Sequence, residues 1–239
     1  PGCGWVRYCP MQQCTTRWAC SGAAMGDPHY LTLKKVAWSC DALGWNVLVE
    51  SADVLVEVHH SALCSTTATA ITSTRVTFKH NGRIVTFETT PSDVPVNDGY
   101  VLANAQSCTD VEGRVYVEVQ RAKTSLGSLM NVIAIVPHPL GGILVDGCPD
   151  QVQPTVTEQA ACAGIKDEFA RHSCNIDVER SKSTEFAEVA KGASQLRDAV
   201  QTVDAPSVND TAAYAKSGSA SRTKTRPPAA FRLSEGGIV

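Results

Sequence analysis

Hydrophobic and polar residues alternate in short runs along the first two thirds of the chain. In residues 73–80, for example, Val76 and Phe78 alternate with polar neighbours. A period of two places apolar side chains on one face of a β-strand. Runs of this kind, rich in β-branched residues, predict strands at 45–51, 53–60, 73–80, 83–89, 114–120 and 131–137.

Turn residues separate these runs. Asn81-Gly82 joins two of them, and this dipeptide is the signature of a type I′ hairpin. Clusters of Gly, Pro, Asn, Asp and Ser at 91–93, 97–99 and 141–142 separate others. Many short strands at regular spacing predict a mainly β fold, an antiparallel β-sandwich.

The hydrophobic period becomes helical towards the C-terminus. Residues 158–172 and 184–201 each predict an amphipathic helix, and Ser183 or Thr184 is expected to cap the second. The apolar faces consist of Cys162, Ile165 and Phe169 in the first helix and of Phe186, Val189, Ala190, Ala193, Leu196 and Val200 in the second. We therefore expect a small α-helical, Cys-containing segment after the sandwich.

From residue 203 onward the chain is rich in Ala, Ser, Thr, Pro and Gly, a composition that predicts an irregular tail. The excess of basic residues in this tail suits contact with an acidic glycan, although a solvated tail is the preferred interpretation. Residues 231–239 could also add a strand to the sheet edge of a neighbouring molecule. The predicted divisions are 1–19, the Cys-rich end of a preceding module; 20–150, the sandwich; 151–202, the helical segment; and 203–239, the tail.

Composition narrows the class of protein. The chain has 239 residues, 43% of them hydrophobic, and a formal net charge of -3, which argues against a dedicated nucleic-acid binder. No apolar run reaches the roughly 18 residues of a membrane span, so no transmembrane segment is expected. The first residues lack the cationic start and apolar stretch of a signal peptide, so we expect any signal to have been removed.

The cysteines are an even number spread along the chain, which predicts disulfides in an oxidising compartment. Apart from Cys9 and Cys14, they lack the close pairs of a zinc site. The predicted disulfide cysteines are Cys3, Cys9, Cys14, Cys20, Cys40, Cys64, Cys108, Cys148, Cys162 and Cys174. Asn209 begins an Asn-Asp-Thr sequon, a predicted glycosylation site. We expect an extracellular or cell-surface protein.

Gly26-Asp27-Pro28-His29 raises a chemical question at the start of a predicted strand. Glycine and proline here can simply make a turn. Alternatively, the Asp27 carboxyl attacks its own carbonyl carbon and the prolyl nitrogen leaves. Gly26 would then let the backbone bend, and His29, an imidazole that ordinarily titrates at about pH 6.5, would donate the proton. The sequence is compatible with both interpretations.

The stretch CSGAAMGDPHYLT (20–32) resembles the von Willebrand factor type D domain. VAWSCDALGWNVLVES (36–51) resembles that family's second segment, and residues 54–64 and 72–87 resemble its next strands. Residues 162–193 resemble the Cys-containing helical region that follows such domains. A similar region ends the repulsive guidance molecules, whose large C-terminal part is itself a partial type D domain. The resemblance covers roughly residues 20–200.

The resemblance implies a type D-like sandwich whose Asp27–Pro28 bond breaks by itself, with the halves held together by the sheet and by disulfides. By family order it suggests that Cys20 pairs with Cys148 and Cys64 with Cys108. Type D domains that hold calcium close with an Asn-rich loop, whereas this chain has GGILVDGCPDQ, with Asp146 and Asp150 alone remaining. We therefore expect neither that calcium site nor, without a CGLC-like motif, disulfide-linked polymerisation.

No ordinary catalytic or cofactor motif is found. His59 and His60 are adjacent in a predicted strand and point to opposite faces, so they are not expected to share a metal. The sequence has no G-x-S-x-G elbow, P-loop or dinucleotide fingerprint. We expect no metal, no cofactor and no turnover enzyme, at most a single autoproteolysis.

Two functions remain. One is a secreted or cell-surface structural or adhesion module that assembles with itself, as fibres or oligomers through its tail, or with other extracellular proteins. The alternative, implied by the repulsive-guidance resemblance, is a signalling ligand or co-receptor that binds a receptor ectodomain or growth factor.

Overall fold

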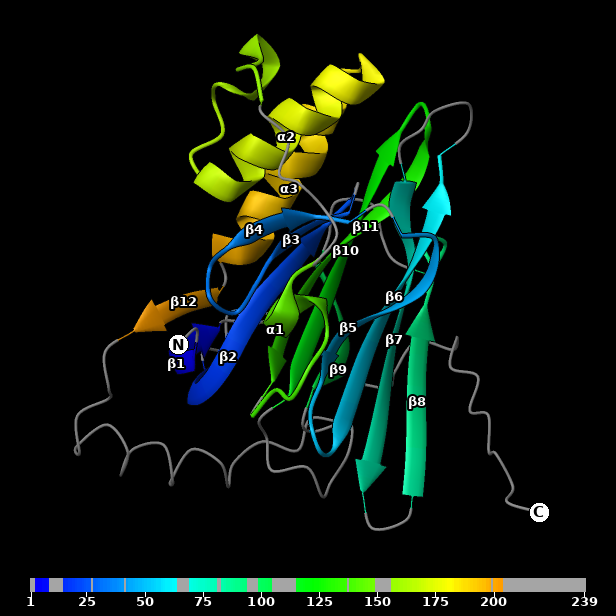
Figure 1. The fold of residues 1–239 in the computed structure, drawn as a ribbon, viewed down its shortest axis with the longest axis vertical. Helices are drawn as coiled ribbons and strands as arrows, with labels where there is room; N and C mark the ends of the chain where they lie inside the picture. The colour runs from blue at the N-terminus through cyan, green and yellow to red at the C-terminus, as the bar shows by residue number, and fades with distance from the viewer. Residues whose placement is uncertain are drawn as a thin grey trace, which may run out of the picture.

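The computed structural model describes residues 3–8, 15–26, 28–40, 42–63, 69–80, 83–93, 99–104, 115–136, 138–148, 156–198 and 200–203. The fold is a mainly β sandwich of two antiparallel sheets, with a small helical segment packed on the larger sheet. Figure 1 shows the resulting layers: helices, larger sheet, smaller sheet. The predicted fold class is confirmed.

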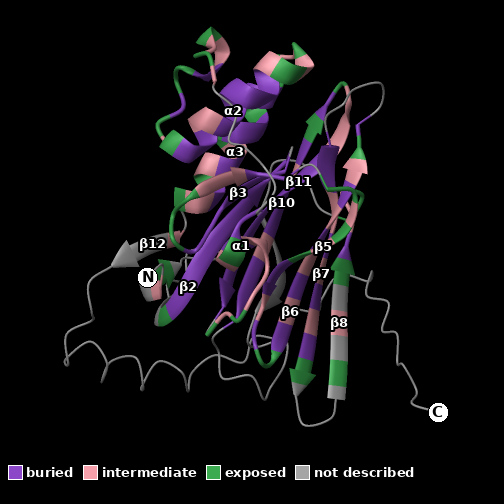
Figure 2. Cartoon of the chain, in the orientation of Figure 1, coloured by how far each residue is buried: buried purple, intermediate pink, exposed green. Residues whose placement is uncertain are grey.

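The smaller sheet has the strand order β5-β6-β7-β8. Its strands are β5 (Gly44–Glu50), β6 (Val54–Ala62), β7 (Thr69–His80) and β8 (Arg83–Thr89). Alternating positions of β6, among them Val54, Val56 and Val58, are buried against the larger sheet. The alternation predicts these four strands correctly because one face of the sheet is covered and the other is more exposed (Figure 2).

The larger sheet has the order β12-β1-β2-β11-β10-β9, with β3 paired to β2 and β4 paired to β3. Its strands are β1 (Cys3–Tyr8), β2 (Thr15–Met25), β3 (His29–Leu31), β4 (Ala37–Ser39), β9 (Gly99–Asn104), β10 (Tyr116–Thr124), β11 (Gly127–Val136) and β12 (Val200–Val203). β2 runs continuously across the division that the sequence suggests at residue 20.

The larger sheet is buried on both faces, and β11 shows this most clearly. Ile133 and Ile135 belong to the core beneath the helices, whereas Val132 and Ala134 belong to the core between the sheets. A strand covered on both faces is apolar throughout rather than alternating. β2 passes through the same layer with small residues, because a Cβ at Gly22 would lie 2.8 Å from Leu144 Cδ1.

The helical segment contains η2 (Ala160–Cys162), α2 (Glu168–Ser181) and α3 (Phe186–Asp198), and a short helix α1 (Ile143–Asp146) lies earlier in the chain. The helix predicted at 158–172 is wrong in its bounds, since α2 begins where Asp167 accepts a hydrogen bond from the Ala170 N–H at 2.8 Å. The second predicted helix agrees closely with α3, whose apolar stripe is buried, although Val200 lies in β12. The Ser183 hydroxyl accepts from the Glu185 N–H at 3.4 Å.

Three disulfides lie among the described residues: Cys3–Cys20, Cys40–Cys148 and Cys162–Cys174. The pairing of Cys20 with Cys148 suggested by family order is therefore wrong. Cys20 lies directly opposite Cys3 in the β1–β2 register, so its partner is set by strand pairing. Cys9, Cys14, Cys64 and Cys108 lie outside the described residues, and so do Asp150, Asn209 and the tail after residue 203.

Candidate functional site

The Gly26–His29 motif connects β2 to β3 in the larger sheet. The Gly26 N–H donates to Asn131 Oδ1 at 3.1 Å, and the Gly26 carbonyl accepts from the Ile71 N–H at 2.8 Å. The Pro28 carbonyl accepts from the Cys40 N–H at 2.9 Å. Asp27 itself lies outside the described residues. The backbone on each side of the Asp27–Pro28 bond is thus held in place by the sheets.

Gly26 lies in close contact with side chains of β11 and α3. A Cβ there would lie 2.8 Å from Leu129 Cδ1 and 3.1 Å from Val189 Cγ1. Gly26 is not among the described glycines with positive φ. The backbone at Gly26 is therefore compatible with other residues, and its closest neighbours are side chains of β11 and α3.

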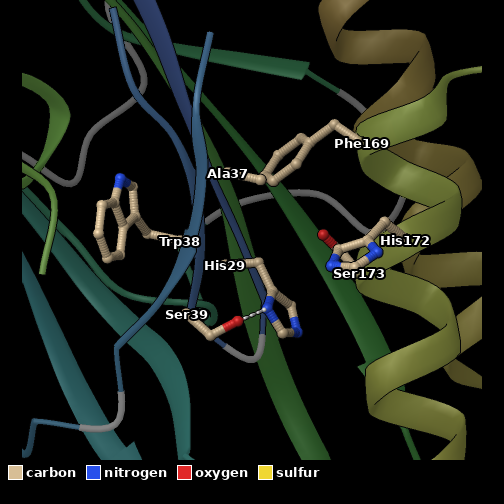
Figure 3. Close-up of a pocket in the computed structure, with 7 residues that line it drawn as sticks. All are labelled: His29, Ala37, Trp38, Ser39, Phe169, His172 and Ser173. Carbon is tan, nitrogen blue, oxygen red and sulfur yellow. Dashed lines mark hydrogen bonds between the residues drawn. The ribbon is translucent and has the colours of Figure 1, made fainter. Parts of the chain in front are cut away.

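His29 is buried and held at both ring nitrogens. Its Nδ1 lies 2.7 Å from Ser39 Oγ, and its Nε2 lies 2.6 Å from Asp177 Oδ1. His29, Ser39 and Asp177 are 2%, 8% and 4% exposed. Figure 3 shows the His29 ring directed towards the Ser39 hydroxyl. The sequence motif supplies His29 alone. Ser39 and Asp177, its two hydrogen-bond partners, come from β4 and α2.

Local structure explains how the three groups meet. His29 and Ser39 are directly opposite in the β3–β4 register. On α2, residues at spacings of four, Phe169, Ser173 and Asp177, share one buried face. Because α2 packs on the larger sheet, this face brings the Asp177 carboxylate to the outer nitrogen of His29.

This arrangement suits an imidazole that gains and loses a proton. An ionised Asp177 accepts a hydrogen bond from His29 Nε2–H in either charge state. The Ser39 hydroxyl donates to Nδ1 when the ring is neutral and accepts from Nδ1–H when it is charged. The site can therefore perform acid–base chemistry without reorienting the ring.

Serine, histidine and aspartate also form the triad of many hydrolases. Ser39 is buried, however, and the cavity beside it has a volume of about 10 Å³, roughly the space for one water. An external acyl substrate has no room to reach Ser39.

The cavity beside His29 is lined by polar and apolar side chains. Its lining residues are His29, Ala37, Trp38, Ser39, Phe169, His172 and Ser173 (Figure 3). A wider groove of about 580 Å³ shares Ala37, Phe169 and His172 with it and continues past Lys35 and Arg197. The small cavity therefore lies next to an open groove.

Charges around the cavity act on each other. Burial lowers the pKa of His172, and the nearby His29 lowers it further, while Glu168 partly offsets this. Burial, followed by the positive charge of Arg197, lowers the pKa of Lys35 in the groove. The neutral form of His172 is thus favoured beside His29.

Sequence reasoning found His29 but missed Ser39, His172, Ser173 and Asp177. Their spacing along the chain carries no motif. The one available signal is the repetition of polar residues on the otherwise apolar face of α2, which is unusual for a buried helix. His59 and His60 lie on different faces as expected, with His60 buried and His59 half-buried.

The remaining candidate residues lie elsewhere in the fold. The Asp146 carboxylate accepts from the Gly142 N–H at 3.2 Å at the start of α1. No cluster of metal-ligating side chains occurs in the described ranges. Within those ranges no helix is both long and apolar enough to cross a bilayer. No protein-family model matches the chain, and no curated protein matches it.

Proposed function

We propose that this protein is an extracellular structural or adhesion module that cleaves its own Asp27–Pro28 bond once during maturation. The observation that carries the proposal is the buried His29, held between Ser39 and Asp177 immediately after that bond. A turn would not need a histidine bonded at both nitrogens inside the protein. Polar groups buried in this way are costly unless they are fully paired, and they are concentrated at functional sites.

The cleavage step uses groups of the motif itself. A carboxylate oxygen of Asp27 bonds to the Asp27 carbonyl carbon, and the bond from that carbon to the Pro28 nitrogen breaks. The prolyl nitrogen takes a proton from the His29 imidazolium through the Ser39 hydroxyl, which bonds to His29 Nδ1. The products are a cyclic anhydride on Asp27, a secondary amine at Pro28 and a neutral His29.

Strand pairing supports a module whose fold persists after its backbone is cleaved. The fragment that ends at Asp27 contains β1 and β2. β2 pairs with β11 and β3, and β1 pairs with β12. These ladders join the two fragments after cleavage, so the sandwich persists as a platform for assembly with itself or with other extracellular proteins.

The test is intact mass of the purified full chain, incubated at about pH 5.5 and about pH 7.4, on either side of the ordinary histidine titration. We expect two fragments, the second beginning at Pro28. Asp27→Asn should remain one chain, because its amide is a poor nucleophile. Asp27→Glu is the matched control, since it keeps the charge but moves the carboxylate by one methylene. An intact wild-type chain under all conditions would reject the proposal.

A further inference from the structure

Ser173 carries a buried hydroxyl that the fold does not satisfy. The residue is 2% exposed, and its Oγ has no hydrogen-bond partner within the part of the chain that the structure describes. An orphaned buried hydroxyl destabilises the fold, so such groups usually bond to ordered water. Ser173 also lines the small cavity beside His29.

The cavity fits one water in both size and chemistry. Its volume of about 10 Å³ is close to that of one water probe, and a buried water needs two to four polar partners, by rough count. Ser39 and Ser173 supply hydroxyls, and His172 supplies an imidazole. Ala37, Trp38 and Phe169 form the rest of the lining, so a larger nucleophile has no room.

We propose that this cavity is a binding site for the hydrolytic water of the self-cleavage reaction, with Ser173 and His172 as the residues that hold it. The inference rests on the proposed function and adds its second step. It also explains why polar side chains of α2 face the motif.

The second step is hydrolysis of the anhydride that the first step forms. The water oxygen bonds to a carbonyl carbon of the Asp27 anhydride, and the bond from that carbon to the bridging oxygen breaks. His29, left neutral by the first step, takes one proton from the water through the Ser39 hydroxyl, which bonds to its Nδ1. The second carboxyl gives its proton to the prolyl amine. The fragment then ends with free α- and β-carboxylates on Asp27, and His29 is again protonated.

The lowered pKa of His172 supports this role, because a neutral imidazole can both accept from and donate to a water. The groups that face the cavity from each element are His29 on β3, Ser39 on β4 and His172 with Ser173 on α2. Asp177 on α2 contacts the far nitrogen of His29. One histidine thus serves as acid in the first step and as base in the second.

One test does not depend on cleavage. A high-resolution crystal structure of the full-length Asp27→Asn variant should contain an ordered water within hydrogen-bond distance of Ser173 Oγ. The same cavity in Ser173→Val should lack that water. A cavity without water in the Asp27→Asn variant overturns the inference.

The second test measures the fate of the anhydride. The full chain is allowed to cleave in the presence of hydroxylamine, which converts an anhydride to a hydroxamate that mass spectrometry distinguishes from the acid. We expect the wild-type fragment to end mainly in the acid, because the bound water reacts first. In Ser173→Val the cavity is filled, so the hydroxamate fraction should rise severalfold.

Ser194→Val is the matched control, since it makes the same change at a partly exposed position of α3 that lies outside the cavity lining. It should keep the wild-type product ratio. Equal hydroxamate fractions in Ser173→Val and the wild type would overturn the water site while cleavage itself stands. Absence of wild-type cleavage would instead reject the proposed function and the inference with it.

Discussion

His29 Nε2 lies 2.6 Å from Asp177 Oδ1, although 148 positions separate the two residues in sequence. The contact joins strand β3 to helix α2, and both side chains are buried. The helical segment therefore completes the environment of the Gly26–His29 motif. A consequence is that the environment of His29 depends on folding of the distant helical segment.

Replacing Asp177 with Asn should slow self-cleavage. General acid catalysis raises a reaction rate by about 10²–10⁴-fold. Without the carboxylate partner of His29, the cleavage rate should fall by at least about tenfold. The charged form of His29 also loses a stabilising negative charge, so cleavage should fall off at a lower pH than in the wild type. The measurement is the rate of fragment appearance against pH, by intact mass.

Asp198→Asn is the control for the change of charge, because Asp198 is exposed at the end of α3. Its cleavage rate should match that of the wild type. A wild-type rate and pH profile for Asp177→Asn, in a variant that melts cooperatively, would show that Asp177 has a structural role alone.

The described disulfides predict how the cleaved fragments separate. Cys3–Cys20 lies within the first fragment, and Cys40–Cys148 and Cys162–Cys174 lie within the second. We expect the fragments to co-elute under native conditions and to separate in denaturant without reduction. Electrophoresis and mass spectrometry with and without reductant measure this. Fragments that separate after reduction alone would place a bridge from Cys9 or Cys14 across the cleavage point.

Half of the described strands follow from local pattern, and the site does not. β6 and β7 alternate because one face of the smaller sheet is covered, so period two is visible in their sequence. The pattern does not reveal β2, because Ala, Ser and Gly replace branched residues where strands and Leu144 approach closely. A local pattern cannot report that Asp177 packs against His29, because that contact depends on how α2 docks.

The pairing of cysteines shows the same limit. The ten cysteines predict that disulfides form, because this inference needs only the cysteine count and not the topology of the fold. The partner of Cys20 is set by the β1–β2 register, which the weak pattern of residues 1–20 does not reveal. The resemblance to type D domains suggests Cys148 as the partner of Cys20. In the structure Cys148 pairs with Cys40.

His172 should make the protein less stable in mild acid. Burial and His29 lower its pKa in the folded state, so the unfolded chain binds a proton at higher pH than the folded chain does. The stability that the neutral ring contributes is complete above the ordinary value of about 6.5 and is lost as the pH falls through the lowered folded value. His172→Gln should reduce the change in stability with pH over this range. Thermal melting between about pH 7.5 and pH 5 measures it, and an unchanged slope would contradict the assignment.

Tyr30→Phe should weaken the contact between the two sheets. The Tyr30 hydroxyl on β3 hydrogen-bonds His60 Nε2 on β6, while His60 Nδ1–H donates to the Ala42 carbonyl at 2.6 Å. Both rings are fully buried, so loss of the hydroxyl should lower the free energy of unfolding by about 1–3 kcal/mol. Urea denaturation measures the change.

Thr77→Val is the matched control for Tyr30→Phe, because it also deletes one hydroxyl that bonds across a sheet. Thr77 Oγ1 lies 3.2 Å from Thr86 Oγ1 on the more exposed face of the smaller sheet. Surface changes of this kind usually stay within about 0.5 kcal/mol, since water replaces the lost partner. Equal losses in the two variants would show that burial between the sheets adds nothing to the Tyr30–His60 bond. A larger loss in Tyr30→Phe would identify that bond as a specific link between the two layers.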